Sequence, residues 1–175
     1  MRCLISHFYR MPLQDILLVV LMVWIADVIF TYICPQKIWR RINVCIFYVT
    51  IGLIFYMTIA GRKVGSNFEI ILVPFSSFHE AKSQPEIYRT LLMNVILFLP
   101  FGLSFPYTLS ELRKHKVQLT IICAGILSLM IEFLQFYFSF GRCEVDDVIM
   151  NTIGAIIGVV VYYLSRKIKL KLDIN

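Results

Sequence analysis

Five long apolar runs separated by short polar segments organise the chain. Each run is close to the roughly 20 residues that a helix needs to cross about 30 Å of hydrocarbon. We therefore expect an all-α, polytopic membrane bundle of about five transmembrane helices, in which one amino-terminal helix precedes a four-helix core. The runs cover residues 16–34, 42–60, 91–109, 117–138 and 148–164.

The composition agrees with a membrane protein, because 59% of the 175 residues are hydrophobic and only 16% are charged. This balance excludes an ordinary soluble domain. The formal net charge of +6 would suit nucleic-acid binding, but the basic residues cluster beside the apolar runs. That placement is typical of topology signals and of contacts with anionic lipid head groups. We predict membrane lipids as partners and no nucleic acid.

The apolar runs divide the chain into three parts. Residues 1–41 hold an interfacial segment and the first helix, which we expect to be retained because no small-residue cleavage site follows it. Residues 42–165 form the main membrane domain, and residues 166–175 form a basic tail. The long connection at 61–90 is expected to lie over the helix ends, because Pro74 interrupts an apolar patch that is too short to span.

The distribution of basic residues predicts the orientation. Lys and Arg number seven on the side of the amino terminus and ten on the side of the carboxyl terminus in a five-helix arrangement. The positive-inside rule then places the carboxyl terminus in the cytoplasm and the amino terminus outside. Asp27, inside the first helix, is expected either to be neutral and hydrogen bonded or to face a polar centre.

Polar side chains in the last two apolar runs repeat with helical spacing. Glu132 and Gln135 are three residues apart, and Asp147 and Asn151 are four apart, so each pair shares one face of a helix. Ionisable groups in a transmembrane segment are costly and mark a functional site by default. The two pairs therefore predict a polar layer between these helices.

Alternating helix directions place a third helix at the same level. The third helix begins, the fourth ends and the fifth begins on one side, so Asn94 is expected level with Glu132, Gln135 and Asn151. We predict a polar pocket that opens to the outer face and has Arg142 and two aspartates at its mouth. The predicted binding residues are Asn94, Glu132, Gln135, Arg142, Asp146, Asp147 and Asn151, and the candidates for catalysis are Glu132 and Asp147.

A purely structural interpretation of the same residues stays open. In it, Gly154 and Gly158 form a small-residue face for close helix packing, Asn151 donates across that contact, and Arg142 pairs with Asp146 or Asp147. Paired aspartates can also bind a divalent cation through oxygen ligands, but no histidine or third carboxylate at metal spacing accompanies them. We predict neither a metal nor a cofactor.

Four segments in order resemble the VanZ-like family of small bacterial membrane proteins. They are LVPF around Pro74, NVILFLPFG at residues 94–102, IEFLQF around Glu132, and GRCEVDDVIMNTIGAIIG at residues 141–158. The resemblance covers about residues 45–165. It implies a multi-pass protein of the bacterial inner membrane, from a family whose founding member is associated with resistance to the lipoglycopeptide teicoplanin.

Two functions follow as hypotheses. The first is an envelope protein that acts at the outer membrane–water interface on a lipid, a lipoglycopeptide or a lipid-linked cell-wall precursor, because teicoplanin's acyl chain anchors it at the membrane surface near its target. The second is a membrane enzyme that modifies a lipid or envelope precursor, with Glu132 as the acid or base and Arg142 holding a phosphate.

Overall fold

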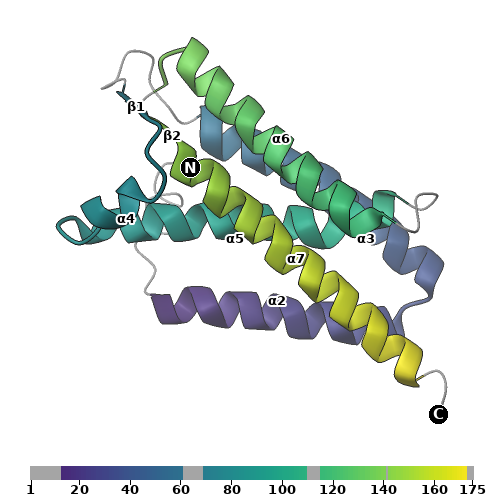
Figure 1. The fold of residues 1–175 in the computed structure, drawn as a ribbon. Coiled ribbons are helices and arrows are strands. Elements are labelled where there is room, and N and C mark those ends of the chain that lie inside the picture. Colours follow the sequence, from purple (N-terminus) through teal and green to yellow (C-terminus); the bar gives the residue numbers. More distant parts are fainter. Residues whose placement is uncertain (1–12, 61–68, 110–114, 141, 173–175) are drawn as a thin grey trace.

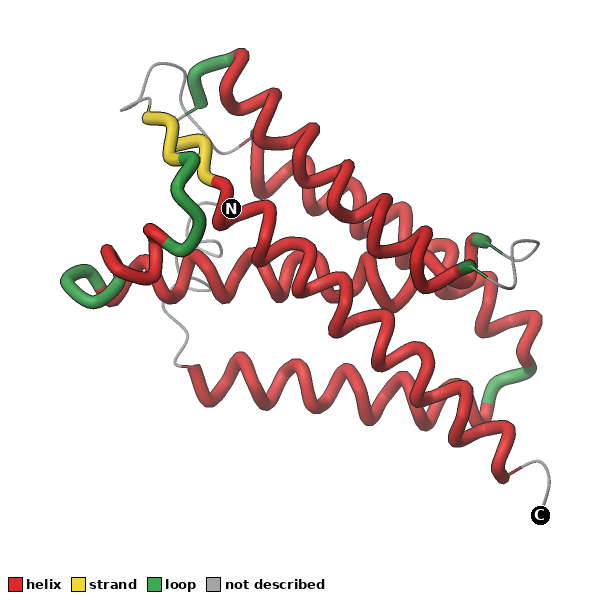
Figure 2. Tube along the Cα trace, in the orientation of Figure 1, coloured by secondary structure: helices red, strands yellow, loops and turns green. Residues whose placement is uncertain are grey.

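The computed structural model describes residues 13–60, 69–109, 115–140 and 142–172, and within them long helices alternate in direction (Figure 1). Helices account for nearly all of the described chain, and only short loops and two short strands interrupt them (Figure 2). The long helices are α2 (Leu13–Ile33), α3 (Gln36–Phe55), α5 (Pro85–Thr108), α6 (Lys116–Tyr137) and α7 (Val145–Leu172), joined by the π-helical η1 (Tyr56–Ala60), the short α4 (Ser76–Glu80), and the strands β1 (Glu69–Ile71) and β2 (Arg142–Glu144).

The predicted helical bundle is confirmed. Each of the five predicted apolar runs falls within a helix to within one residue at its end, and the second run extends from α3 into its continuation η1. Among the described residues, four helical spans are long and apolar enough to cross a membrane, and α2 contributes a shorter apolar stretch, Leu21–Ile33. The four spans are Gln36–Ile59, Glu86–Thr108, Lys116–Tyr137 and Val145–Lys169.

Helix α5 lies at the centre of the bundle, packed against α3, α6 and α7. Its Phe98 and Phe101 are buried in a cluster with Ile54 of α3, Ile131 of α6 and Ala155 of α7. Proline is normally excluded from a helix interior, but α5 continues through both Pro100 and Pro106. Helix α5 contributes buried aromatic side chains to the core and, nearer its start, the polar side chain of Asn94.

Backbones approach closely where α5 crosses α7. A Cβ atom at Gly154 would overlap the carbonyl of Val95, and a Cβ at Gly158 would overlap the carbonyl of Leu99. Gly102 of α5 meets the backbone of Ala155 in the same way. Small residues let two membrane helices pack this closely without a driving force from water, so these glycines fix the distance between the two helices.

A two-stranded parallel sheet closes one end of the bundle, which the sequence analysis did not predict. β1 pairs with β2 in the register Glu69 with Arg142 and Ile71 with Glu144. The connection at 61–90 thus contributes a strand and α4, although its residues 61–68 lie outside the described part. The expected loop between the fourth and fifth helices is correspondingly short, and α7 begins at Val145, three residues before the predicted run.

At the opposite end, α2 packs mainly on α7. The Nζ of Lys169 donates to the backbone carbonyl of Thr31 at 2.9 Å. Asp27, one turn earlier in α2, is buried and interacts with Ser165 of α7. Asp27 therefore belongs to the contact between the first and last helices, and it lies far from the end where α7 begins.

Candidate functional site

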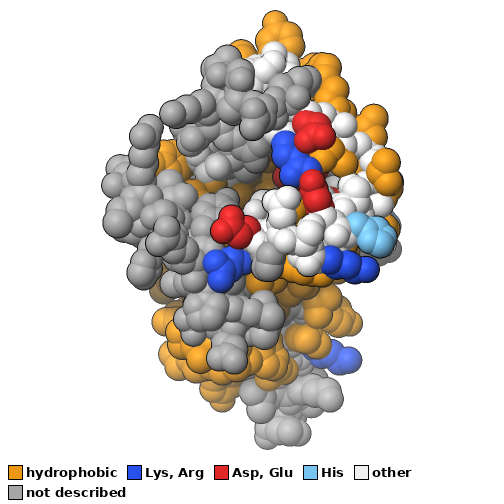
Figure 3. Space-filling model, turned by 90° about the vertical axis from the view of Figure 1, so that its left-hand side faces the viewer, with side chains coloured by type: hydrophobic (Ala, Val, Ile, Leu, Met, Phe, Trp, Pro, Cys, Tyr) orange, Lys and Arg blue, Asp and Glu red, His pale blue; other side chains and the backbone are white. Residues whose placement is uncertain are grey.

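The end of the bundle where α5 and α7 begin and α6 ends carries the sheet and most of the predicted polar residues. Viewed from that end, acidic and basic side chains gather beside one another, with hydrophobic side chains below them and along the edge of the view (Figure 3). Pairing of β1 with β2 holds the chain at residues 142–144 across the end of α6. This geometry brings a strand, a helix end and two helix starts together.

Arg142 is the centre of an ion-pair cluster. Its Nη2 lies 2.7 Å from Oε2 of Glu80, and its Nε lies 3.0 Å from Oε1 of Glu144 and 3.5 Å from Oε2 of Glu69. Partial burial acts to lower the pKa of Arg142, but the hydrogen bond to Glu80 and the charges of the three glutamates outweigh it and raise the pKa. The cluster joins β1, α4 and β2 through one guanidinium group.

Asp146 anchors the backbone at the start of α4. Its Oδ1 accepts the N–H of Phe75 at 2.6 Å, and its Oδ2 accepts the N–H of Ser77 at 2.8 Å. The Ser77 hydroxyl also donates to Glu144 at 2.7 Å. Asp146 is only 1% exposed. Of the two partners that the structural interpretation offered to Arg142, Asp146 is instead used by two backbone donors of the 61–90 connection.

Asp147 lies on a different face of the same helical turn and points towards α5. Its Oδ1 accepts a hydrogen bond from Nδ2 of Asn94 at 2.6 Å. A carboxylate in the first turn of a helix is also stabilised by the helix dipole, so the local sequence of α7 favours Asp147 at this place. The predicted meeting of the third and fifth helices at Asn94 is present as this direct bond.

Glu132 of α6 holds the strand that follows it. Its Oε2 accepts the backbone N–H of Glu144 at 3.0 Å, and its backbone carbonyl lies 3.7 Å from the Cys143 sulfur. Burial raises the pKa of the Cys143 thiol to about 11, and the negative charges of Glu132, Asp147 and Glu144 add to this effect. Three carboxylates therefore surround the middle of β2.

Gln135 and Asn151 lie apart from this group. The Nε2 of Gln135 donates to the carbonyl of Thr58 at 3.1 Å, which ties α6 to η1. The Nδ2 of Asn151 donates to the hydroxyl of Ser128 at 2.8 Å, deeper between α6 and α7. The predicted polar layer is thus divided into separate contacts, because each polar side chain finds the neighbour that its own helix crosses at that level.

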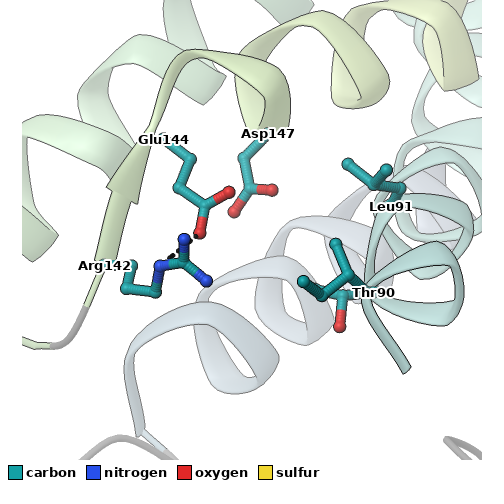
Figure 4. A pocket seen from close by; sticks show the side chains of 6 residues that line it. Thr90, Leu91, Arg142, Glu144 and Asp147 are labelled. Atoms are coloured by element: carbon teal, nitrogen blue, oxygen red, sulfur yellow. Dashed lines mark ion pairs between the residues drawn. The ribbon is translucent and has the colours of Figure 1, made fainter. Parts of the chain in front are cut away.

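A cavity of about 240 Å³ opens beside Asp147. Glu144 and Asp147 point into it from one side, and Thr90 and Leu91 of α5 face them from the other (Figure 4). Of the predicted binding residues, Arg142 and Asp147 line this space. Its described lining residues are Ile87, Thr90, Leu91, Arg142, Glu144 and Asp147.

The α5 wall of the cavity was missed by the sequence analysis. Thr90 lies four residues before Asn94, so the two share a helix face, and this spacing was the available signal. Ile87 and Leu91 gave none, because apolar residues at the start of a membrane helix are ordinary. Within the described ranges, no three His, Cys, Asp or Glu side chains gather in an arrangement that would hold a metal ion.

Comparisons with known proteins give two matches. The family model described as VanZ/LLP1 matches residues 17–166. Protein VanZ of Enterococcus faecium is 36% identical over 80 residues, which cover 46% of this chain and 48% of that protein. The match thus spans about half the length of this curated relative. No solved structure matches the chain.

Proposed function

The chain belongs to the VanZ/LLP1 family, and on that premise we propose that it acts at the outer membrane–water interface on a lipid or lipid-linked molecule. In this proposal the molecule's polar head enters the cavity beside Asp147, and the result is reduced susceptibility to teicoplanin-type lipoglycopeptides. The family membership and the apolar spans make the chain a multi-pass membrane protein. The cell membrane of a bacterium is the proposed location.

The position and lining of the cavity carry this proposal. The cavity lies where the apolar helices end and charged side chains gather. Its wall combines charged groups of β2 and α7 with the apolar Ile87 and Leu91 of α5. A pocket with both kinds of wall suits an amphipathic molecule whose head is polar and whose chains stay in the bilayer.

The orientation of the chain in the membrane determines whether the cavity faces the side on which the antibiotic acts. The excess of basic residues on the other side supports a cytoplasmic carboxyl terminus, and the cavity, at the opposite end of α7, then faces outwards. A lipoglycopeptide is held at that surface by its acyl chain. A protein that binds or alters outer-leaflet head groups would weaken this anchoring and so reduce the drug's local concentration at its target.

The enzyme hypothesis with Glu132 as acid or base stays a prediction. Glu132 contacts the backbone of Glu144, and its side chain is not among the described residues that line the cavity. The guanidinium of Arg142, assigned to phosphate in that hypothesis, contacts three glutamates. The contacts described for these two residues therefore give no reason to prefer covalent chemistry over binding.

Expression in a susceptible bacterium that lacks the protein tests the proposal. The chain should raise the inhibitory concentration of teicoplanin, and it should leave that of a glycopeptide without an acyl chain nearly unchanged. Asp147→Asn, which keeps an oxygen acceptor for Asn94, and Glu132→Ala should each abolish the effect at equal membrane levels. Glu86→Gln removes an exposed charge on the same end, outside the described cavity lining, and should keep the effect. Full resistance in a well-expressed Asp147→Asn variant would contradict the proposal.

A further inference from the structure

The charges around the cavity are unequal. Arg142 contributes one positive charge, whereas Glu69, Glu80 and Glu144 pair with it and Asp147 adds a further carboxylate. Counted as formal charges, these five side chains carry a net charge of −3. Only Arg142, Glu144 and Asp147 of these five line the cavity, so its described wall carries a formal net charge of −1, and the other two glutamates lie behind it on the arginine.

The ion pairs of Arg142 oppose its use as an anion receptor. A guanidinium has five N–H donors in a fixed fork, and three carboxylates from β1, α4 and β2 lie within 3.5 Å of its nitrogens. A phosphate that bound the same group would have to approach these three carboxylates closely. Like charges at such distances repel, so an anionic head would be disfavoured at this position.

Burial strengthens the preference for a cation. Asp147 is 8% exposed, and the facing wall includes the apolar side chains of Ile87 and Leu91. A carboxylate that is removed from water in this way is stabilised by an opposite charge and by hydrogen-bond donors. A positively charged group with N–H donors supplies both, and it would lie between Asp147 and Glu144.

The volume of the cavity limits which molecules can enter it. The cavity of about 240 Å³ is smaller than the roughly 300 to 1,000 Å³ of pockets that enclose drug-sized ligands. It fits one head group and excludes a whole lipoglycopeptide. The side chain of Thr90 lies across from the two carboxylates (Figure 4). Its hydroxyl donates to the backbone carbonyl of Glu86 at 3.5 Å, so its oxygen can still accept an N–H from such a head.

We propose that the cavity between Glu144, Asp147 and Thr90 binds a primary ammonium head group, carried by a membrane lipid or by a lipid-linked molecule. This inference rests on the proposed function, and it names the chemistry of the head that the site selects. It assigns Asp147 and Glu144 to the ammonium group and makes Arg142 the group that holds Glu144 in place.

A pair of lipids that differ in one charge tests the inference. The full chain is purified in nanodiscs of phosphatidylcholine, and photo-crosslinkable phosphatidylethanolamine is compared with the same lipid acetylated on its amine, which keeps the phosphate and the acyl chains. We expect crosslinking at the start of α5, around Ile87–Leu91, with at least a tenfold preference for the free amine, equivalent to about 1.4 kcal/mol.

Variants assign that preference to the carboxylates. Asp147→Asn and, independently, Glu144→Gln should each reduce the preference to less than threefold, while Glu86→Gln should keep it near the wild-type value. Having two variants protects the test against the misfolding of one. Soluble glycerophosphoethanolamine is added as a competitor at millimolar concentration. If it reduces crosslinking of the lipid, the site recognises the head group alone. If crosslinking is unchanged, the ammonium head is recognised only together with the acyl chains.

The outcomes separate the two proposals. Equal crosslinking of both lipids at α5, or stronger crosslinking of the acetylated lipid, would overturn the ammonium assignment and leave the proposed function standing. Absence of any lipid crosslink at the start of α5, in protein that still confers teicoplanin resistance, would overturn both the cavity as the site of action and the inference built on it.

Discussion

The carboxylate of Asp146 accepts the backbone N–H of Phe75 at 2.6 Å, although the two residues are 71 positions apart. Phe75 has a φ of 64°, a left-handed conformation that costs a non-glycine residue about 1 kcal/mol or more. The same carboxylate accepts the N–H of Ser77. One side chain of α7 thus holds a strained turn and the start of α4 against the end of the bundle.

Replacing that side chain should release the turn. Asp146→Ala removes two hydrogen bonds to a charged acceptor, each worth about 1.5 to 3 kcal/mol, and leaves two backbone donors without their partner. We expect faster proteolysis between residues 76 and 84 and a lower thermal midpoint in detergent. Asp146→Asn, which retains one acceptor oxygen, should lie between Ala and wild type. Unchanged proteolysis in Asp146→Ala would show that the turn is held by other contacts.

Replacing a glycine by alanine should change the stability of the protein in a direction that depends on whether the glycine lies at the α5–α7 crossing. In a helix interior, Gly→Ala normally stabilises by up to about 1 kcal/mol. At Gly154 the new Cβ would overlap the carbonyl of Val95, so Gly154→Ala should instead destabilise by about 1 to 3 kcal/mol. Thermal unfolding followed by fluorescence measures the difference.

Two other glycines supply the control for that measurement. A Cβ at Gly52 would meet nothing within 4 Å, and one at Gly125 would lie 3.8 Å from the Thr152 hydroxyl oxygen. Gly52→Ala and Gly125→Ala should therefore be neutral or stabilising. If Gly154→Ala were also neutral or stabilising, α5 and α7 would not approach each other as closely as the structure shows.

The thermal midpoint of a variant that lacks Arg142 should depend on the salt concentration. Arg142→Gln leaves Glu69, Glu80 and Glu144 close together without their shared cation, at a cost of about 1 to 2 kcal/mol for groups that are partly exposed. Raising the salt concentration screens this repulsion, so the thermal midpoint of the variant should recover in part. Arg142→Lys keeps the charge but not the fork, and it should retain more stability than Gln. A midpoint for Gln equal to wild type at low salt would contradict the ion-pair account.

The thiol of Cys143 should react slowly at neutral pH. Thiolate is the reactive form, and because burial raises the pKa of Cys143 to about 11, only about one thiol in a thousand is ionised at pH 8. The rate of maleimide labelling, measured in a variant with Cys143 as its single cysteine, should rise with pH up to about 11.

Glu132 contributes to that shift through its negative charge. Glu132→Gln should therefore lower the pKa of Cys143 and increase labelling at pH 8 severalfold, while burial keeps the rate below that of an exposed cysteine. Replacement of Glu86, which is not among the groups that shift the pKa of Cys143, serves as the control and should leave the labelling rate as it is. A labelling profile centred near pH 9 in the parent chain would contradict the environment that the structure gives to this thiol.

Orientation can be tested with reporters at the two ends of the bundle. A fluorescent protein that matures only in the cytoplasm should be bright when fused after Asn175. Alkaline phosphatase, which is active only outside the cytoplasm, should be active when fused within residues 82–84. The opposite pair of results would place the cavity on the cytoplasmic side, and the proposed action at the outer surface would then be wrong.

Some of this protein could be predicted from its sequence. The five apolar runs determined the helices, because a helix is the structure that satisfies every backbone group within a single segment in lipid. Their alternation determined which helix ends meet, and so placed Asn94 at the end of the bundle where the fifth helix begins, although only the structure shows its bond to Asp147. Residues such as Gly154 and Gly158 recur on one helix face, and spacing alone was enough to group them.

The partners of the polar groups were decided by the tertiary structure. Pairing of β1 with β2 depends on contact between residues about 73 positions apart, and three-residue strands carry no periodic signal that would reveal it. That contact brings Glu69 and Glu80 to Arg142 and leaves Asp146 for Phe75. Helical spacing fixes the face on which a side chain lies, whereas the neighbour that the face meets depends on the crossing of whole helices and on the return of a distant segment.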